Sequence, residues 1–340
     1  MSQKLVEVAR GELVECVHRG YVAVTDLEGN ILYKLGDPNH VTYFRSAAKP
    51  IQALAVFESG AVDKYKFTDE EIAIFCASHA GEEQHTQMVS KILEKIGVDE
   101  GFLQCGVHAP LNKETCIELY KRGKKPESLH CNCSGKHSGM LAAAKAWGFS
   151  LENYRDINHP LQQQMLQLVA DFAEVEKQEI IVGVDGCGVP VFGLPISRMA
   201  LAFAKLSKPH KCLKQERMEA VKRITSSMIK HPQLIAGIKR FDTRLLEVTK
   251  GKLIGKVGAE GVFCVGLMNQ GIGIAVKVED GNPRALWPSV VHVLKQLKVL
   301  DAREIEQLKN FYPIKLKNFH KEVVGEIRPV FQLQPYNAEK

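Results

Sequence analysis

The order of hydrophobic patterns along the chain constrains its fold more than any other feature. Turn-forming segments separate paired apolar runs near both ends, which predicts β-hairpins over residues 21–34 and 262–278. Between them, apolar residues recur three or four positions apart, which predicts helices over residues 138–147, 161–175 and 217–229. Strands at both ends with helices between them indicate a mixed α/β (α+β) fold. We expect a sheet with antiparallel hairpins packed with helices, rather than regular βαβ alternation.

The 340 residues contain no internal repeat and no low-complexity linker. A chain with 45% hydrophobic and 25% charged residues has the composition of a globular protein with a sizeable core. We therefore expect a single unit over residues 1–335, with a helical subdomain around residues 110–175 and a C-terminal tail at residues 336–340.

Charge and hydropathy argue against nucleic-acid and membrane partners. The net charge is +6, and its densest basic segment, residues 121–125, contains no aromatic residue that could stack on bases. A membrane-spanning helix needs about 18 consecutive apolar residues. The most apolar stretch, residues 261–278, is interrupted by the polar residues Asn269 and Gln270. No glycine-rich phosphate-binding loop is present, which leaves a nucleotide cofactor unsupported.

The N-terminal segment and the cysteines predict a cytoplasmic protein. Residues 1–10 lack the apolar run and cleavage site of a secretory signal. The nine cysteines are odd in number and scattered, so we expect reduced thiols, some of which could bind a metal.

The first candidate for chemistry is Ser46-Ala47-Ala48-Lys49, just before Pro50 at a predicted helix start. One helical turn would place the hydroxyl and the amine on one face, where a neutral lysine could take the serine proton. The same spacing recurs at Ser227 and Lys230 inside an ordinary helical pattern, so spacing alone does not identify a catalytic pair.

Ser78 follows a short apolar run, residues 72–76, which we predict to be a strand. Its neighbours His79 and Glu82 suggest a triad, but adjacent residues rarely point at one another, so the interpretation of His79 as a hydrogen-bonding residue is favoured. Lys256 precedes a glycine turn, and it would matter only if it faced a serine.

Cys133, Lys136 and His137 form a third cluster, with Cys187 in a later turn after a predicted strand. Thiolates and imidazoles are good zinc ligands. The paired Cys-x-x-Cys units of a zinc ribbon are absent, so buried thiols and a metal site are both open interpretations.

These motifs occur in one order along nearly the whole chain, and together they resemble the L-asparaginase II family of the Rhizobium etli type. The matching segments are Arg10-Gly11 with Glu15 and His18-Arg19-Gly20, Arg45-Ser46 with Lys49-Pro50, Ser78-His79, Cys133-Ser134-Gly135-Lys136-His137, Asp185-Gly186-Cys187-Gly188 and Lys256-Val257-Gly258-Ala259-Glu260-Gly261. The resemblance implies a fold similar to serine β-lactamases and a class of glutaminases, a homodimer, and L-asparagine as the small-molecule substrate.

The resemblance also implies two Ser-Lys pairs, Ser46 with Lys49 and Ser78 with Lys256, and leaves open which serine attacks the amide. It implies a Zn2+ ion held by Cys133, Lys136, Cys187 and a water. Lysine is a rare ligand because it must first lose a proton. We expect backbone N–H groups near the attacking serine to stabilise the oxyanion.

Arg45, His137 and Asp185 match positions that line the family's substrate pocket. We expect Asp185 to bind the α-ammonium group of asparagine and Arg45 to meet a carboxylate or balance local charge. The chain departs from the family at Ala80, which replaces a serine, and at Cys131, an added thiol that could compete for metal or oxidise.

Three other hypotheses remain. Metal-bound water could attack the amide of another small substrate. The chain could be an amidase of the penicillin-recognising type. Alternatively, it could be a non-enzymatic protein in which zinc at Cys133 and Cys187 stabilises the fold.

Overall fold

The computed structural model describes residues 1–208 and 214–336, so residues 337–340 of the expected tail lie outside the described part. The chain divides into two compact units. Unit 1 comprises Met1–Ala47, Leu194–Lys208 and Arg244–Lys340, and unit 2 comprises Ala48–Gly193 and Pro209–Thr243. Residues 110–175, where a helical subdomain is expected, lie in unit 2.

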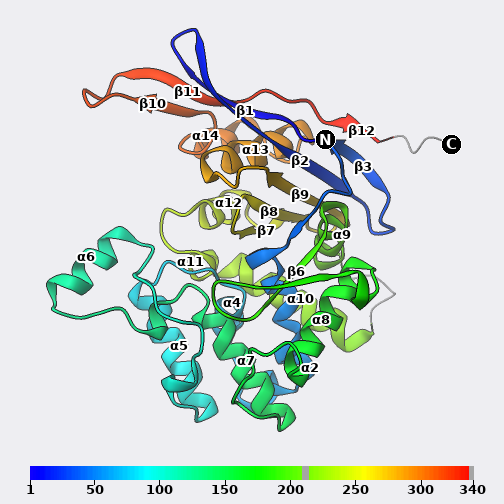
Figure 1. The fold of residues 1–340 in the computed structure, drawn as a ribbon, viewed down its shortest axis with the longest axis vertical. Coiled ribbons are helices and arrows are strands. Elements are labelled where there is room, and N and C mark those ends of the chain that lie inside the picture. The colour runs from blue at the N-terminus through cyan, green and yellow to red at the C-terminus, as the bar shows by residue number, and fades with distance from the viewer. Residues whose placement is uncertain (209–213, 337–340) are drawn as a thin grey trace. The chain divides into compact units, whose positions relative to one another are not determined.

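Unit 1 is built on an antiparallel sheet (Figure 1). Its main path runs β10-β11-β1-β2-β9-β8-β7, and β3 pairs with both β2 and β12. The strands are β1 (Gln3–Arg10), β2 (Leu13–Thr25), β3 (Ile31–Leu35), β7 (Leu253–Gly258), β8 (Val262–Leu267), β9 (Ile272–Val278), β10 (Ile314–Lys317), β11 (Val323–Pro329) and β12 (Gln334–Pro335). Both predicted hairpins are confirmed, as β2–β3 and β8–β9.

Helices pack on this sheet, and one glycine shows how closely they approach. Helix α9 (Ile196–Ser207) contacts β8 and β9, while α13 (Pro283–Gln296) contacts β9 and β11. A Cβ at Gly273 would lie 1.8 Å from the backbone oxygen of Ala200, so only glycine fits beneath α9. The mixed α+β fold with an antiparallel sheet is therefore confirmed.

Unit 2 is mainly helical. Its helices include α1 (Lys49–Gln52), α2 (Leu54–Glu58), α3 (Ala61–Lys64), α4 (Asp69–Phe75), α5 (Glu83–Ile96), α6 (Lys113–Lys121), α7 (Ser134–Trp147), α8 (Pro160–Ala173), α10 (Gln215–Lys230) and α11 (Pro232–Ile235). A short antiparallel pair joins β5 (Ile181–Val184) to the first residues of β6 (Pro190–Pro195). The predicted helices over residues 138–147 and 217–229 are confirmed within α7 and α10, and the one over residues 161–175 is confirmed by α8 except for its last two residues.

Helix α7 is the centre of unit 2 and contacts α2, α4 and α5. A Cβ at Gly135 would lie 2.2 Å from the backbone oxygen of Ile74, so the start of α7 touches the backbone of α4. This close approach brings the α7 N-terminus, which begins after Cys133, beside the segment that follows α4 and contains Ser78.

The predicted strand over residues 72–76 is wrong, because residues 72–75 belong to helix α4 and Cys76 is its C-cap. The Thr68 hydroxyl accepts a hydrogen bond from the Glu71 N–H, and the Glu71 carboxylate accepts one from the Thr68 N–H at 2.7 Å. This capping box fixes the start of a helix. Ser78 therefore follows the end of a helix rather than the end of a strand.

Across residues 1–208 and 214–336, each helix is too short or too polar to cross a lipid bilayer.

Candidate active site

Unit 2 brings Lys49 and Ser78 into direct contact. Lys49 Nζ lies 3.0 Å from Ser78 Oγ and donates a hydrogen bond to the backbone oxygen of Ala77 at 2.5 Å. Both side chains are buried, with 1% of Lys49 and 4% of Ser78 exposed. A serine hydroxyl with an amine at this distance has the geometry of a nucleophile beside a general base.

The backbone amides at Ser78 are already committed. The Ser78 N–H donates to the backbone oxygen of Ile235 at 2.9 Å, and the His79 N–H donates to that of Asn132 at 3.2 Å. These bonds hold the loop in place, but they leave neither amide free for an oxyanion. The expected stabilisation of the oxyanion by backbone N–H groups near the attacking serine stays a prediction.

His79 interacts with Ser134. Its Nδ1 accepts a hydrogen bond from the Gly81 N–H at 3.2 Å, and its Nε2 lies 2.9 Å from Ser134 Oγ. The Ser134 hydroxyl donates to the backbone oxygen of Leu129, so it accepts from His79. His79 is fully buried, and it ties the loop after α4 to the start of α7.

Cys133, Lys136 and Cys187 converge in the same unit. Cys133 precedes α7 and Lys136 lies in its first turn, which places them three positions apart on one helix face. Lys136 Nζ lies 3.1 Å from Cys187 Sγ, and the thiol of Cys133 interacts with that of Cys187. All three side chains are 5% exposed. The predicted metal ligands therefore lie together, although Cys187 comes from the turn between β5 and β6.

The protonation of this cluster follows from its charges. Burial opposes the charge on Lys136, but the neighbouring Cys187, Cys133 and Asp185 outweigh it and raise the pKa of the amine. Hydrogen bonds from the thiols of Cys131 and Cys187 lower the pKa of Cys133 well below its usual range. The arrangement thus favours a thiolate beside an ammonium group.

The donor set fits a zinc ion. Two buried sulfurs are ligands that zinc prefers, and a lysine amine can complete the set once it has lost its proton. Nowhere in residues 1–208 and 214–336 do three or more His, Cys, Asp or Glu side chains form a group that could hold a metal. A zinc site here would therefore depend on Lys136 as its third protein ligand.

His137 lies next to Lys136 and is fully buried. Its Nδ1 lies 2.6 Å from the Tyr154 hydroxyl, which also accepts a hydrogen bond from the Gln104 N–H at 3.0 Å. Nε2 of His137 has no hydrogen-bond partner among the described residues. Burial, with the charge of Lys136 adding to it, lowers the pKa of the imidazole well below its usual range, so the ring is neutral.

Asp185 lies at the end of β5, half-buried, and its Oδ1 accepts a hydrogen bond from the Gly186 N–H at 2.8 Å. Its charge contributes to the raised pKa of Lys136. Asp185 is therefore part of the same electrostatic environment as the Cys133–Lys136–Cys187 cluster.

Ser46, Arg45 and Lys256 belong to unit 1. Arg45 has φ of +51°, a left-handed conformation that is costly for a residue with a side chain. Lys256 lies in β7, is fully buried, and donates a hydrogen bond to the Val257 backbone oxygen at 2.9 Å. The pairs Ser46–Lys49 and Ser78–Lys256 each combine one residue from either unit, and both stay predictions.

Sequence reasoning did not identify the contact between Lys49 and Ser78 or the role of Tyr154. Lys49 and Ser78 are 29 positions apart in the sequence. Tyr154 lies in an irregular segment between α7 and α8, with no periodic pattern around it. A contact between segments so far apart has no signature in local spacing.

Comparison with known proteins identifies a family. Residues 6–329 match the family model described as L-asparaginase II. No curated protein matches the chain.

Solved structures resemble the chain only loosely. A β-lactamase from Mycobacterium bovis has 13% identity and a TM-score of 0.43, with 83% of this chain and 95% of that one covered. The native form of Mglu has 12% identity and a TM-score of 0.40, with 84% and 62% covered. A mutant simvastatin synthase from Aspergillus terreus has 13% identity and a TM-score of 0.40, with 82% and 93% covered. Similarity at this level supports no inference about chemistry.

Proposed function

Because the chain belongs to the L-asparaginase II family, we propose that it hydrolyses the side-chain amide of L-asparagine to L-aspartate and ammonia. The observation that carries this proposal is the buried contact of 3.0 Å between Lys49 Nζ and Ser78 Oγ. This contact supplies the nucleophile and the base that amide hydrolysis needs.

In this mechanism Ser78 is the nucleophile and Lys49, in its neutral form, is the base. Ser78 Oγ attacks the amide carbon while its proton passes to Lys49. The proton then passes to the amide nitrogen and the C–N bond breaks. Ammonia departs, and the acyl group remains bound to Ser78 Oγ as an ester. Water attacks this ester, Lys49 again accepts a proton and returns it to Ser78 Oγ, and L-aspartate is released.

The other predicted site residues keep the roles expected for them. The resemblance pairs Ser46 with Lys49 and Lys256 with Ser78, so Ser46 and Lys256 complete the proposed catalytic set. Asp185 binds the α-ammonium group of the substrate, Arg45 binds its carboxylate or balances the local charge, and His137 lines the substrate pocket. We also assign the protein to the cytoplasm. We propose that it forms a homodimer, and size-exclusion chromatography with light scattering would test the dimer.

Cys133, Lys136 and Cys187 hold the Zn2+ ion in this proposal. When bound, zinc would supply a Lewis acid for an oxygen ligand. Lys136 must release its proton to join the site, and the two buried thiolates offset part of the metal's charge. The hydrolysis itself is assigned to the chain's own residues, since the Lys49–Ser78 contact already provides a nucleophile and a base.

The test is ammonia release from L-asparagine by purified, zinc-quantified protein, with L-glutamine and D-asparagine as parallel substrates. We expect release from L-asparagine and its loss in Ser78→Ala. The matched control is Ser227→Ala, which removes a buried hydroxyl from the other Ser-x-x-Lys sequence, in α10.

Other outcomes would assign a different function. Full activity in Ser78→Ala, combined with loss of activity on chelation, would replace the serine mechanism with attack by metal-bound water. Absence of turnover in folded, zinc-loaded protein would contradict the asparaginase assignment, and unfolding on removal of zinc would then favour a structural metal.

A further inference from the structure

We propose that Tyr154 is a positioning residue that holds His137 as the tautomer with hydrogen on Nε2, so that this N–H donates a hydrogen bond to an oxygen of the substrate. This inference rests on the proposed function for the identity of the substrate. The tautomer itself is a property of the unliganded chain.

Hydrogen-bond accounting at the Tyr154 hydroxyl determines the tautomer. The oxygen accepts from the Gln104 N–H at 3.0 Å, and the hydroxyl lies 2.6 Å from His137 Nδ1. If Nδ1 carried the hydrogen, the oxygen would accept twice and the hydroxyl hydrogen would be buried without an acceptor. If the hydroxyl instead donates to Nδ1, the Tyr154 hydroxyl and Nδ1 both have their hydrogen bonds. Nδ1 then carries no hydrogen, so the ring is neutral and its hydrogen lies on Nε2.

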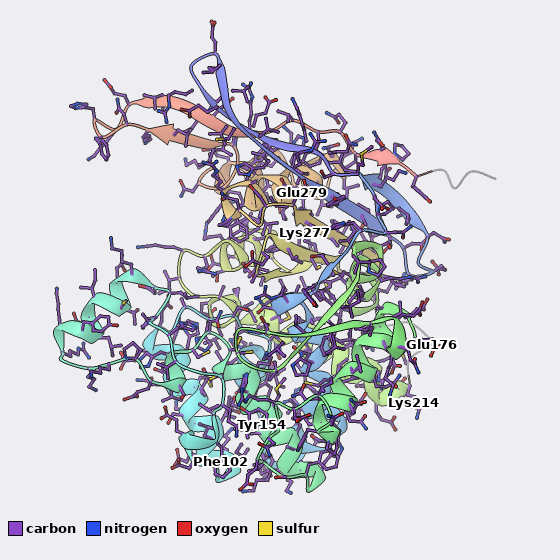
Figure 2. All side chains as sticks on the ribbon, viewed as in Figure 1. Phe102, Tyr154, Glu176, Lys214, Lys277 and Glu279 are labelled. Atoms are coloured by element: carbon purple, nitrogen blue, oxygen red, sulfur yellow. The ribbon has the colours of Figure 1, made fainter. Side chains whose placement is uncertain are left out.

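Tyr154 is held rigidly enough to fix the imidazole. The tyrosine is fully buried, and its backbone oxygen accepts a hydrogen bond from Gln162 Nε2 at 2.7 Å. Its ring meets that of His137 edge-on, with centroids 5.6 Å apart and an interplanar angle of 75°. Figure 2 shows Tyr154 among the helices of unit 2.

Nε2 of His137 is the end of the ring that is left to bind a ligand. Nε2 of His137 is buried without a partner among the described residues, and a buried unsatisfied donor is costly unless a ligand completes it. His137 follows Lys136 in the first turn of α7, so it lies beside the proposed zinc ligands. The backbone N–H groups of Ser78 and His79 already donate hydrogen bonds within the protein, so an oxygen of the substrate needs another donor.

The same tautomer explains why a histidine beside three proposed metal ligands would not be a fourth. A nitrogen that carries hydrogen has no lone pair for a metal, and Nδ1 is occupied by the Tyr154 hydroxyl. His137 is therefore assigned to the substrate rather than to zinc.

The first experiment is nitrogen-15 NMR of histidine-labelled wild-type protein, with the His137 signals assigned by their absence in His137→Gln. We expect a protonated Nε2 and an unprotonated, hydrogen-bonded Nδ1, and a shift of the Nε2–H signal on addition of L-aspartate, the product. A protonated Nδ1 in the wild type would overturn the proposal, as would an Nε2–H signal that does not respond to L-aspartate when the enzyme turns over L-asparagine.

The second experiment compares Tyr154→Phe with Tyr65→Phe. Tyr65, the C-cap of α3, is a matched control because its hydroxyl is also buried and has no hydrogen-bond partner in the described part of the chain. We expect Tyr154→Phe to give a mixture of His137 tautomers and to lower kcat/KM by roughly 10- to 100-fold, the usual effect of removing a residue that orients a site ligand, while Tyr65→Phe changes neither. An unchanged tautomer and unchanged kinetics in folded Tyr154→Phe would refute the positioning role.

These readouts separate the two proposals. If the wild type does not hydrolyse L-asparagine, the proposed function fails, yet the NMR measurement still decides whether Tyr154 sets the tautomer. If the wild type is active but His137 carries its hydrogen on Nδ1, only the inference about Tyr154 fails. Thermal unfolding of Tyr154→Phe identifies a folding defect, and the wild-type spectrum does not depend on that variant.

Discussion

Lys49 Nζ lies 3.0 Å from Ser78 Oγ, and the two residues are 29 positions apart in the sequence. Lys49 begins α1, and Ser78 lies in the loop after α4. The amine also bonds to the Ala77 backbone oxygen, so it is fixed at the base of the same loop. The geometry therefore does not depend on the flexibility of a long lysine side chain.

We predict that Lys49→Met lowers kcat for L-asparagine by about 10²- to 10⁴-fold, because general-base catalysis contributes rate enhancements of this size. Methionine keeps an unbranched side chain of similar length without the amine. Ammonia release measures the effect, and Lys230→Met, in the other Ser-x-x-Lys sequence, is the control. Retention of wild-type kcat in Lys49→Met would show that Ser78 uses a different base.

Cys133→Ser and Cys187→Ser should each lose bound zinc, because hydroxyl oxygens replace thiolates poorly as zinc ligands. The measurement is zinc per chain by mass spectrometry after dialysis. Cys131→Ser is the matched control, since Cys131 is equally buried and interacts with Cys133 but is not a proposed ligand. Equal loss of zinc from all three variants would instead assign Cys131 to the metal site.

Gly135→Ala should destabilise unit 2 by about 1–3 kcal/mol, the usual cost of forcing an extra carbon into a packed region. The new Cβ would lie 2.2 Å from the Ile74 backbone oxygen, where neither α7 nor α4 can yield without moving its backbone. Thermal unfolding measures the change. Gly186→Ala is the control because a Cβ there meets no atom within 4 Å. If both variants melt alike, α7 and α4 pack less closely than the structure indicates.

Asp69 should make the stability of the chain depend on acid pH. A hydrogen bond from Lys230 is the main reason that the pKa of this carboxyl is lowered; burial opposes the shift, and the charges of Lys230 and Arg223 reinforce it. Because the folded-state pKa is lowered, the stabilisation is present above the unfolded-state value, about 3.9, and is lost as pH falls through the folded-state pKa.

We therefore predict that the wild type is more stable than Asp69→Asn at pH 7, by about 0.2–1 kcal/mol as for other exposed ion pairs. The difference should shrink below about pH 4. Urea unfolding of both proteins at several pH values provides the measurement, and Asp63→Asn, at an exposed position in α3, is the control. A difference that stays constant down to pH 2 would contradict the assignment.

Much of the fold could be predicted because it depends on local periodicity. Strands β8 and β9 and helices α7, α8 and α10 lie where the apolar spacing indicates them. The error at residues 72–76 has a local cause, since a short apolar run fits a buried strand or a buried helix equally well. The capping box of Thr68 and Glu71 distinguishes the two, and it is visible in the sequence.

The sequence by itself determined the residue types of the candidate site and the spacing of three positions between Cys133 and Lys136. A helix repeats every 3.6 residues, so neighbours on one face follow from spacing alone. Only the tertiary structure decided that Lys49 meets Ser78, that Cys187 meets Lys136, and that Tyr154 meets His137. These contacts join residues 17 to 51 positions apart, and local spacing does not encode contacts between segments so far apart.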